Sequence, residues 1–270
     1  MLVYDFKNTG QIYGLTNNDL VEPKHAERIA KLSDSILSDF DYEKYKNIPP
    51  YRNESMRTMQ ELIRLSQIPS DDEFTLKMDK VQHSFKKLCE ELNVDFSEKM
   101  VEELKNSVSG VILDLKYHFN RPRPYKLAPL LNIELDTNEI KDTTSDSPSY
   151  PSGHAAQGTL ISNYLAYKNP LSRAKFLKLG RNIAKSRITA KVHYPSDVSL
   201  GEQIGNDIFT YLKENKLIWN LQKKITMPAK LKPSSKQYIK DGNGKMTNKW
   251  FIQHYTVSGA TTEELKKLYE

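Results

Sequence analysis

The segment from Ser97 to about Phe119 constrains the fold more than any other part of the sequence. Its apolar residues recur at the three- and four-residue spacing of one helix face, at Val101, Leu104, Val108, Val111, Ile112 and Leu115. This pattern predicts a long helix that carries Lys116 at its C-terminal end. Pro122 and Pro124 then end the helix, because proline lacks an amide hydrogen and disfavours helical conformation in the preceding residue.

The same periodicity predicts further helices at about 23–40, 56–68, 70–92, 153–168, 171–191 and 195–216. Two S/D-x-x-E patterns, Ser70 with Glu73 and Asp95 with Glu98, are interpreted as capping boxes. No convincing strand precedes residue 217. We therefore expect residues 1–216 to form an all-α bundle of about seven helices. Residues 125–150 read as a long polar loop that forms a lid or rim.

The basic residues are unevenly distributed. Residues 217–270 hold ten Lys against four Asp or Glu, whereas residues 1–216 hold equal numbers of acidic and basic groups. The tail is therefore predicted to be a small basic appendage, with a β-hairpin around the turn-like sequence DGNGK at 241–245. A basic appendage of this kind also raises the alternative of a nucleic-acid or anionic-surface binding protein.

Cysteine content and hydropathy limit the class of protein. Cys89 is the only cysteine, so no intrachain disulfide or thiolate metal site is predicted. The N-terminal residues lack the apolar run of a signal peptide, and no stretch approaches the length of a membrane span. A cytoplasmic protein is expected, with a virus-encoded protein or a non-standard export route as alternatives. Homo-oligomerisation stays open.

Three fragments carry candidate chemistry. The first is Pro151-Ser152-Gly153-His154. Ser152 is a good N-cap, and amides at a helix start with Gly153 can approach an anion closely. A capped helix start beside a histidine is nevertheless common, so this fragment alone favours an ordinary structural role.

The second fragment joins Lys116 to Arg123 across the proline break. A turn between them allows both side chains to reach one oxyanion, with Arg suited to bidentate contact and Lys acting as a point charge. A basic helix terminus that offsets the helix dipole explains the same residues. This fragment alone favours the structural interpretation.

The third fragment contains Arg187, His193 and Asp197. Arg187 and His193 would face different ways on one continuous helix, but Pro195 predicts a break that lets both face one cavity. Asp197 is placed to accept the Nδ1 hydrogen of His193, which leaves Nε2 as a nucleophile. The structural alternative makes Asp197 a dipole partner and His193 a capping group.

Taken together, the three fragments resemble the signature of the type 2 phosphatidic acid phosphatase and vanadium haloperoxidase superfamily. The matching patterns are Lys116-x6-Arg123-Pro124, Pro151-Ser152-Gly153-His154 and Ser186-Arg187-x5-His193-x3-Asp197. The flanking sequences SYPSGH and RPRPY are similar to those of soluble class A bacterial acid phosphatases. The resemblance covers about residues 116–205 and implies a helical phosphatase fold.

The resemblance implies a mechanism without a metal or other cofactor. Phosphate would be bound by Lys116, Arg123, Arg187 and the amides around Ser152 and Gly153. The resemblance makes His193 the nucleophile, Asp197 its orienting group and His154 the acid and then the base, which predicts an acidic pH optimum. The expected partner is a small phosphorylated substrate, such as a metabolite or nucleotide, rather than nucleic acid.

Two features leave the activity open. A glycine is common two residues before the nucleophilic histidine in this superfamily, and here Lys191 occupies that position, as a substrate contact or an outward-facing residue. The same cations could instead hold vanadate, as a phosphate mimic or as the cofactor of a haloperoxidase. The remaining histidines, His25, His83, His118 and His254, show no metal-ligand spacing and are interpreted as surface or capping residues.

Overall fold

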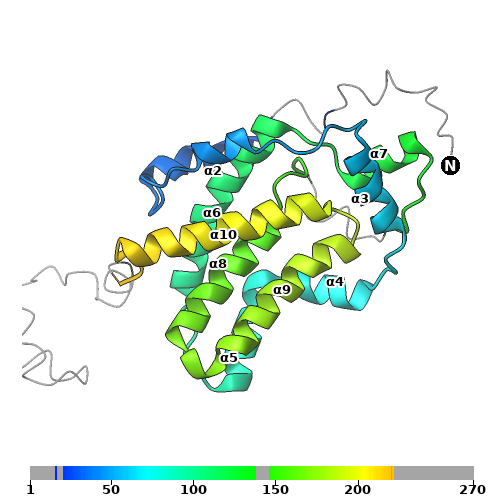
Figure 1. Ribbon diagram of the computed structural model, residues 1–270. Coiled ribbons are helices and arrows are strands. Elements are labelled where there is room, and N and C mark those ends of the chain that lie inside the picture. The colour runs from blue at the N-terminus through cyan, green and yellow to red at the C-terminus, as the bar shows by residue number, and fades with distance from the viewer. Residues whose placement is uncertain (1–15, 17–20, 138–145, 220, 222–270) are drawn as a thin grey trace, which may run out of the picture. The chain divides into compact units, whose positions relative to one another are not determined.

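The computed structural model describes residue 16 and residues 21–137, 146–219 and 221, and within these residues the protein is helical and has no strand (Figure 1). The elements are α2 (Pro23–Ala30), η1 (Lys31–Asp34), η2 (Glu43–Asn47), α3 (Met56–Ser66), α4 (Asp72–Asp79), α5 (Val81–Leu92), α6 (Glu98–Phe119), α7 (Pro124–Leu127), η3 (Ala128–Leu131), α8 (Gly153–Lys168), η5 (Pro170–Ser172), α9 (Arg173–Thr189) and α10 (Pro195–Glu214). The predicted all-α class is confirmed.

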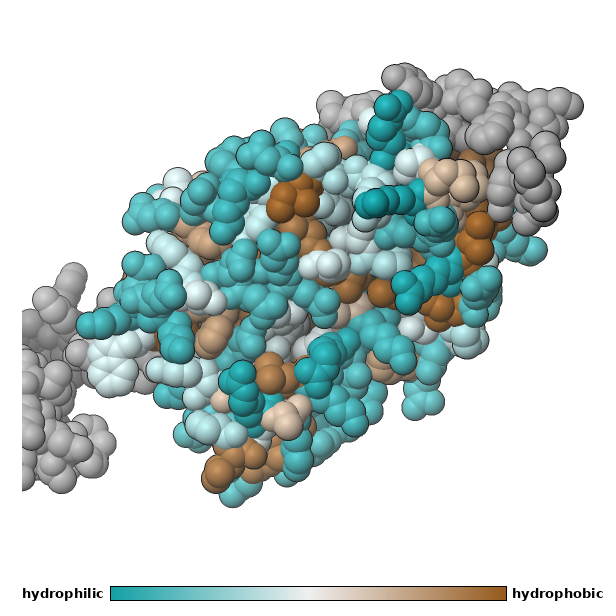
Figure 2. All heavy atoms as spheres, viewed as in Figure 1, coloured by the Kyte–Doolittle hydropathy of each residue, from teal (hydrophilic) through white to brown (hydrophobic). Residues whose placement is uncertain are grey.

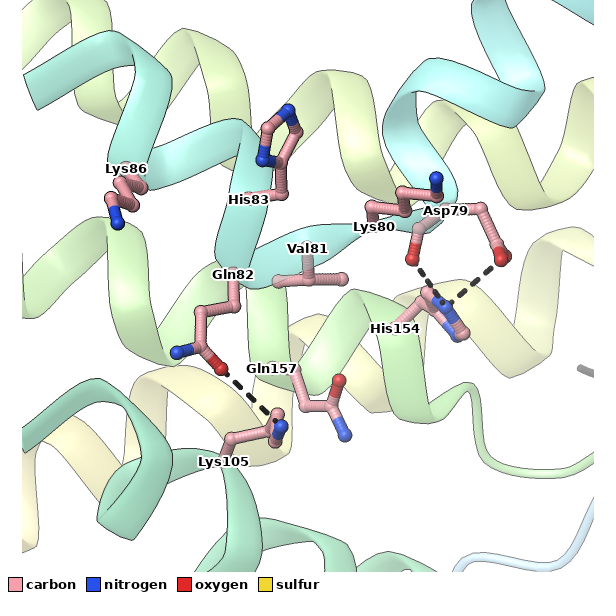
Figure 3. A pocket seen from close by; sticks show the side chains of 9 residues that line it. All are labelled: Asp79, Lys80, Val81, Gln82, His83, Lys86, Lys105, His154 and Gln157. Carbon is pink, nitrogen blue, oxygen red and sulfur yellow. Dashed lines mark hydrogen bonds and ion pairs between the residues drawn. The ribbon is translucent and has the colours of Figure 1, made fainter. Parts of the chain in front are cut away.

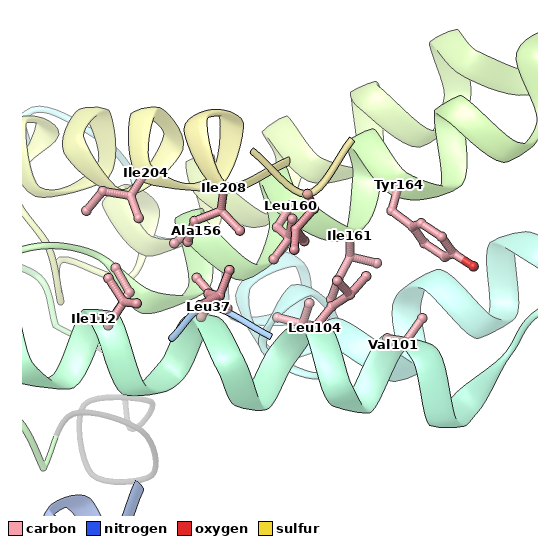
Figure 4. Packing of buried hydrophobic residues seen from close by; sticks show 14 of the residues in the cluster. Leu37, Val101, Leu104, Ile112, Ala156, Leu160, Ile161, Tyr164, Ile204 and Ile208 are labelled. Carbon is pink, nitrogen blue, oxygen red and sulfur yellow. The ribbon is translucent and has the colours of Figure 1, made fainter. Parts of the chain in front are cut away.

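Helix α8 lies at the centre of the bundle. It packs against α6, α9 and α10, while α2 packs on the outer side of α6 (Figure 1). Figure 4 shows Leu104 of α6 across from Leu160 of α8, and Ile112 of α6 on the side of Ile204 of α10, with Ile208 in the same cluster. Burial of side chains of this size contributes roughly 1.5–3 kcal/mol each, so this core fixes the positions of the helix ends that form the site.

Helices α8 and α10 approach each other closely through a glycine. A Cβ atom added at Gly201 would overlap the carbonyl oxygen of Ser152, the N-cap of α8. The amide of Ser152 in turn donates to the carbonyl oxygen of Asp197, in the first turn of α10, at 2.9 Å. This contact places the start of α8 directly against the start of α10.

The segment predicted as one helix over 70–92 forms two helices. Asp71, not Ser70, caps α4, since its carboxylate accepts a hydrogen bond from the Phe74 amide at 2.9 Å. Lys80 then leaves the helical conformation with φ −85° and ψ 69°, and α5 begins at Val81. No proline or glycine marks this break, so apolar periodicity alone did not separate the two helices. The break leaves Asp79 at the C-terminal end of α4.

Other predicted boundaries differ less. The first helix is α-helical only to Ala30 and continues as a 3-10 turn to Asp34. The segment expected to be a loop after residue 124 begins with α7 and η3, because proline suits the first position of each. The helices over 98–119, 153–168 and 195–214 lie close to their predicted limits.

The helical body continues beyond residue 216, since Ile218 and Leu221 are buried in the same core. Spatial clustering divides the chain into Met1–Ile225 and Thr226–Glu270. The second unit lies outside the described residues, so the basic appendage and its hairpin stay predictions. Figure 2 shows a largely hydrophilic face with scattered hydrophobic side chains. Among the described helices, none has the length and apolar character required to cross a lipid bilayer.

Candidate active site

Lys116 and Arg123 lie at the end of α6 and just before α7, and both are buried. Lys116 Nζ donates to the carbonyl oxygen of Pro148 and, at 3.3 Å, to that of Ser149. Arg123 Nε donates to the carbonyl oxygen of Ser147 at 2.9 Å. The residues before α8 therefore hold both cations through backbone carbonyls, and in the described part of the chain neither cation forms an ion pair with a carboxylate.

His193 lies on the connector between α9 and α10, where the proline break was predicted. Its Nε2 atom lies 3.0 Å from Arg123 Nη1, and its Nδ1 atom lies 3.2 Å from Asp197 Oδ2. A guanidinium can only donate hydrogen bonds, so Nε2 carries a lone pair and Nδ1 carries the hydrogen. Burial and the nearby Arg123 and Lys116 charges hold the pKa of His193 well below its usual range. The imidazole is therefore neutral.

Asp197 is fully buried and is held by several donors. Its Oδ1 atom accepts from Arg121 Nη1 at 2.6 Å, and its Oδ2 atom accepts from the Tyr194 amide at 3.0 Å and from the Ser149 hydroxyl. Burial alone would raise the pKa of Asp197, but Arg121, His193 and Ser149 lower it below the usual range. The carboxylate is thus ionised and fixed in orientation.

Arg121 links Asp197 to a second carboxylate. Its Nη2 atom lies 3.1 Å from Glu61 Oε2, and its guanidinium stacks 3.7 Å over the Tyr194 ring. Glu61 also accepts from the amide of Ser196 at 2.6 Å at the start of α10. The series Glu61, Arg121, Asp197 and His193 therefore runs from α3 to the imidazole through charged contacts.

His154, in the first turn of α8, has a corresponding carboxylate partner in Asp79. Its Nε2 atom lies 3.2 Å from the Asp79 carbonyl oxygen and 3.3 Å from Asp79 Oδ1. Since a carbonyl oxygen only accepts, Nε2 carries a hydrogen. Asp79 Oδ1 also lies 2.6 Å from Nη1 of the buried Arg187. One carboxylate therefore orients both the imidazole and the guanidinium.

The electrostatics of this second group follow from its burial. Burial and the Arg187 charge lower the pKa of His154, while Asp79 opposes them. Burial would raise the pKa of Asp79, but His154 and Arg187 together lower it. Asp79 is therefore ionised, and His154 is protonated only below the ordinary imidazole range.

The three cations of the predicted site interact unfavourably with one another. Burial lowers the pKa of Lys116 well below its usual value, and the Arg123 and Arg187 charges add to this effect. Burial also lowers the pKa of Arg123 to about 10, with a further contribution from Arg187. A bound anion would relieve this repulsion, so the cluster favours a ligand with two negative charges.

The start of α8 supplies fewer amides than predicted. The Ser152 amide is used by the Asp197 carbonyl oxygen, and the Ser152 hydroxyl accepts from the Ala155 amide at 3.4 Å. The amides of Gly153 and His154 have no acceptor among the described residues. These two amides are the ones that can bind an anion at the positive end of the helix dipole.

A cavity of about 360 Å³ brings the predicted groups together. Five of the predicted site residues line it: Lys116, Arg123, Gly153, His154 and His193. Arg187 and Asp197 do not line it. Asp197 contacts the lining residue His193, and Arg187 contacts Asp79, which in turn contacts the lining residue His154. The opposite side comes from α2 and includes Lys24 and Arg28. The volume and the charge suit a phosphate group with a small substituent.

Two residues differ from the sequence interpretation. The structure does not bring Lys191 to this cavity, since its buried Nζ atom donates to the Thr189 carbonyl oxygen at 2.8 Å. His25 is not a surface residue: it is buried, lies 2.8 Å from the Tyr117 hydroxyl through Nδ1, and lines the α2 side of the cavity. An apolar helix pattern did not distinguish an inward from an outward histidine there.

The supporting residues Asp79, Glu61, Arg121 and Ser149 were not predicted from the sequence. Arg121 and Ser149 lie in the flanking sequences RPRPY and SYPSGH, and that was the available signal. Asp79 and Glu61 lie far from the three fragments and in helices without a motif. Within the described residues no group of three or more His, Cys, Asp or Glu is placed to hold a metal ion.

Comparison with known proteins agrees with the site geometry. Residues 104–212 match the family model of the PAP2 superfamily. Non-specific acid phosphatases of Salmonella typhimurium and Salmonella typhi are 32% and 31% identical over 98 residues, 36% of this chain and 38% of theirs. That of Providencia stuartii is 28% identical over 145 residues, 50% of this chain and 57% of the relative.

The chain thus spans less than two thirds of the length of these relatives. A crystal structure of a bacterial vanadium-dependent iodoperoxidase aligns with 75% of this chain and 52% of that one, at 14% identity and a TM-score of 0.35, which is too low to carry an argument. The family match includes every one of the three motif fragments. Residues 104–212, which hold the whole candidate motif set, are therefore similar in sequence to the PAP2 superfamily.

Proposed function

We propose that this protein is a phosphatase that hydrolyses phosphomonoesters through a phosphohistidine intermediate on His193, without a metal ion. The observation that carries the proposal is the neutral His193 imidazole, whose Nε2 lone pair lies 3.0 Å from Arg123 Nη1 on the wall of the cavity. A phosphate bound to Arg123 and Lys116 would lie against this lone pair. The similarity to non-specific acid phosphatases supports the same activity.

In the first step the Nε2 lone pair attacks phosphorus and the bond from phosphorus to the leaving oxygen breaks. The leaving oxygen takes a proton from His154 as it departs. Because His154 Nε2 already donates to Asp79, the transferable proton is on Nδ1 in this arrangement. Asp197 stabilises the positive charge that develops on His193 through its contact with Nδ1–H.

In the second step a water molecule gives a proton to the neutral His154 and its oxygen attacks phosphorus. The bond from phosphorus to nitrogen breaks, which restores the His193 lone pair and releases inorganic phosphate. Lys116 and Arg123, with the Gly153 and His154 amides, offset the charge on the phosphoryl oxygens in both steps, and Arg187 adds its positive charge from behind the cavity lining. Small metabolites or nucleotides are the proposed substrates, since the cavity is modest in size.

The test compares the wild-type protein with His193→Ala. The matched control is His118→Ala, which removes an exposed histidine in the last turn of α6. We expect hydrolysis of p-nitrophenyl phosphate with a chelating agent present, a loss of at least about 10³-fold in His193→Ala, and no loss in the control. Hydrolysis that persists in His193→Ala, or that stops with the chelator, would contradict the proposal.

The same proteins should be assayed for bromide oxidation with vanadate and peroxide. Vanadate is a tetrahedral anion, and the same cations would bind it in place of phosphate. Bromination without phosphate ester hydrolysis would replace the proposed activity with that of a haloperoxidase.

A further inference from the structure

A second cavity adjoins the phosphate-sized cavity at His154. It has a volume of about 500 Å³ and is lined mainly by the α4–α5 junction and the first turns of α5, with Lys105 from α6 (Figure 3). His154 and Gln157 of α8 line both cavities, whereas Lys116, Arg123 and His193 line only the first. Figure 3 shows His154 beside Asp79 at one end of the second cavity, with Gln157 between His154 and Lys105.

The second cavity is basic. Lys80, Lys86 and Lys105 line it, and its carboxylate, Asp79, is already in contact with Arg187 and His154. Lys86 forms an exposed ion pair with Glu98 at 2.6 Å. Lys105 Nζ donates to the neutral side chain of Gln82 at 3.4 Å, and among the described residues neither Lys105 nor Lys80 forms an ion pair with a carboxylate. Two ammonium groups are therefore available for an anion.

The position of this cavity relative to His193 indicates what it would hold. In an in-line displacement the leaving oxygen lies opposite the attacking nitrogen. The leaving oxygen must also contact His154, which protonates it. The alcohol part of the substrate therefore extends past His154, and the second cavity, which shares His154 and Gln157 with the first but is not lined by His193, is the space that can receive it.

We propose that this second cavity binds the leaving group and selects phosphate esters whose alcohol part carries a further anionic group, a carboxylate or a second phosphate. The inference rests on the proposed phosphatase activity. The rim on α2 is a weaker candidate for this role, because Lys24 is paired with Asp146 there and only Arg28 lacks a carboxylate partner in the described part of the chain.

The test uses 3-phosphoglycerate and glycerol 3-phosphate, which share a carbon skeleton but differ in a carboxylate against a hydroxymethyl group. The wild-type protein should have a higher kcat/KM for 3-phosphoglycerate. In Lys80→Gln/Lys105→Gln this value should fall about tenfold, mainly through KM, since the charge contacts of the exposed Lys80 and the half-buried Lys105 are lost. For glycerol 3-phosphate it should stay within about twofold. Fructose 1,6-bisphosphate against fructose 6-phosphate extends the test to a second phosphate.

Two matched controls separate this subsite from general charge effects. Lys175→Gln removes an exposed lysine of α9 that lines neither cavity and should change nothing. Arg28→Gln removes the cation of the α2 rim and should leave the preference for the anionic ester intact. A preference that disappears in Arg28→Gln, or an equal loss for both esters in the double variant, would overturn the proposal.

Binding to His193→Ala, measured by calorimetry, keeps the inference separate from the activity. If the wild-type protein hydrolyses no ester, the proposed function fails. The subsite still requires that His193→Ala binds 3-phosphoglycerate more tightly than glycerol 3-phosphate, and that Lys80→Gln/Lys105→Gln in the same background removes the difference. Equal affinities for the two esters would reject the subsite whatever the activity.

Discussion

At the scale of single residues, each histidine of the site is oriented by a carboxylate that also contacts an arginine. Asp197 contacts His193 and Arg121, and Asp79 contacts His154 and Arg187. The two arrangements have opposite consequences. The first leaves a lone pair on Nε2 of His193, whereas the second places a hydrogen on Nε2 of His154. These two arrangements fit the proposed roles, attack by His193 and proton transfer by His154.

The pH dependence of the proposed reaction follows from His154. Burial and Arg187 lower its pKa below 6.5, so the acid form required to protonate the leaving group is lost as pH rises through that lowered value. The value of kcat/KM should therefore fall toward neutral and alkaline pH. In Asp79→Asn the fall should begin at lower pH, because the group that raises the pKa of His154 is gone, and kcat at pH 6 should drop about tenfold or more.

A pH–rate profile of both proteins checks this prediction, with Asp114→Asn as the control for loss of a half-buried carboxylate that pairs with Lys46. The fold itself should tolerate the acidic assay. Since the folded pKa of Asp79 is lowered, its stabilising effect is present above the unfolded value and is lost only as pH falls through the lower folded value. Identical profiles for the wild-type protein and Asp79→Asn would contradict the role given to Asp79.

Arg121 provides a prediction that separates positioning from substrate binding. It contacts Asp197 and Glu61 and lines no part of the phosphate-sized cavity. Arg121→Lys keeps the charge but cannot contact both carboxylates in the same geometry. We expect kcat to fall about tenfold with KM nearly unchanged, and the free energy of unfolding to fall by about 3 kcal/mol. Steady-state kinetics and urea unfolding measure the two effects, and a change confined to KM would be inconsistent with this role.

At the scale of helices, the contact between α8 and α10 sets the site geometry. A side chain at Gly201 would overlap the Ser152 carbonyl oxygen, one turn from Asp197. A side chain at Gly205 would approach the Ala156 carbonyl oxygen at 2.6 Å, one turn further from the site. Substitution of Gly201 by alanine would therefore overpack the contact between α8 and α10 near the site, and substitution of Gly205 would overpack the same contact one turn away.

We expect Gly201→Ala and Gly205→Ala to lower the free energy of unfolding by similar amounts, roughly 1–3 kcal/mol each. Only Gly201→Ala should also lower kcat strongly, because it displaces the start of α8, with His154, from Asp197. Thermal unfolding and kinetics of the two variants check this. A comparable loss of kcat in both would show that the effect is not local to the site.

Much of this arrangement could be predicted from the sequence because the core is periodic and its breaks are chemically marked. The stripe from Val101 to Leu115 predicted α6, and Ser152 and Pro195 predicted the starts of α8 and α10. The break at Lys80 could not be predicted, since no proline, glycine or capping residue marks it. The roles of Asp79 and Glu61 could not be predicted for a related reason. Each role depends on which helices pack together, and the sequence of a single helix does not show which neighbours its carboxylates contact.

At the scale of the whole molecule, the site concentrates positive charge in the interior of a domain whose first 216 residues are neutral overall. The lowered pKa of Lys116 means that burying its charge costs stability at neutral pH. A bound dianion should offset this loss of stability, because its negative charge compensates the buried positive charge. Phosphate or vanadate at about a hundred times the dissociation constant should stabilise the fold by about 2.7 kcal/mol, and raise Tm accordingly.

This stabilisation should be absent in Arg123→Met, which removes a cavity cation, and retained in Arg181→Met, which removes an exposed arginine of α9. Differential scanning calorimetry with sulfate and chloride as comparison anions measures it. If the anion raised Tm equally in Arg123→Met and in the wild-type protein, the anion would bind at a site other than the cavity that Arg123 lines.

The most direct test of the account is to identify the phosphorylated residue during turnover. The protein is mixed with a phosphomonoester, quenched in alkali to preserve phosphohistidine, and digested for mass spectrometry. We predict phosphate on His193, a larger phosphorylated fraction in His154→Ala with a substrate whose leaving group needs no proton, and none in His193→Ala. Phosphate on any other residue, or continued hydrolysis by His193→Ala, would contradict the assignment of His193 as the nucleophile.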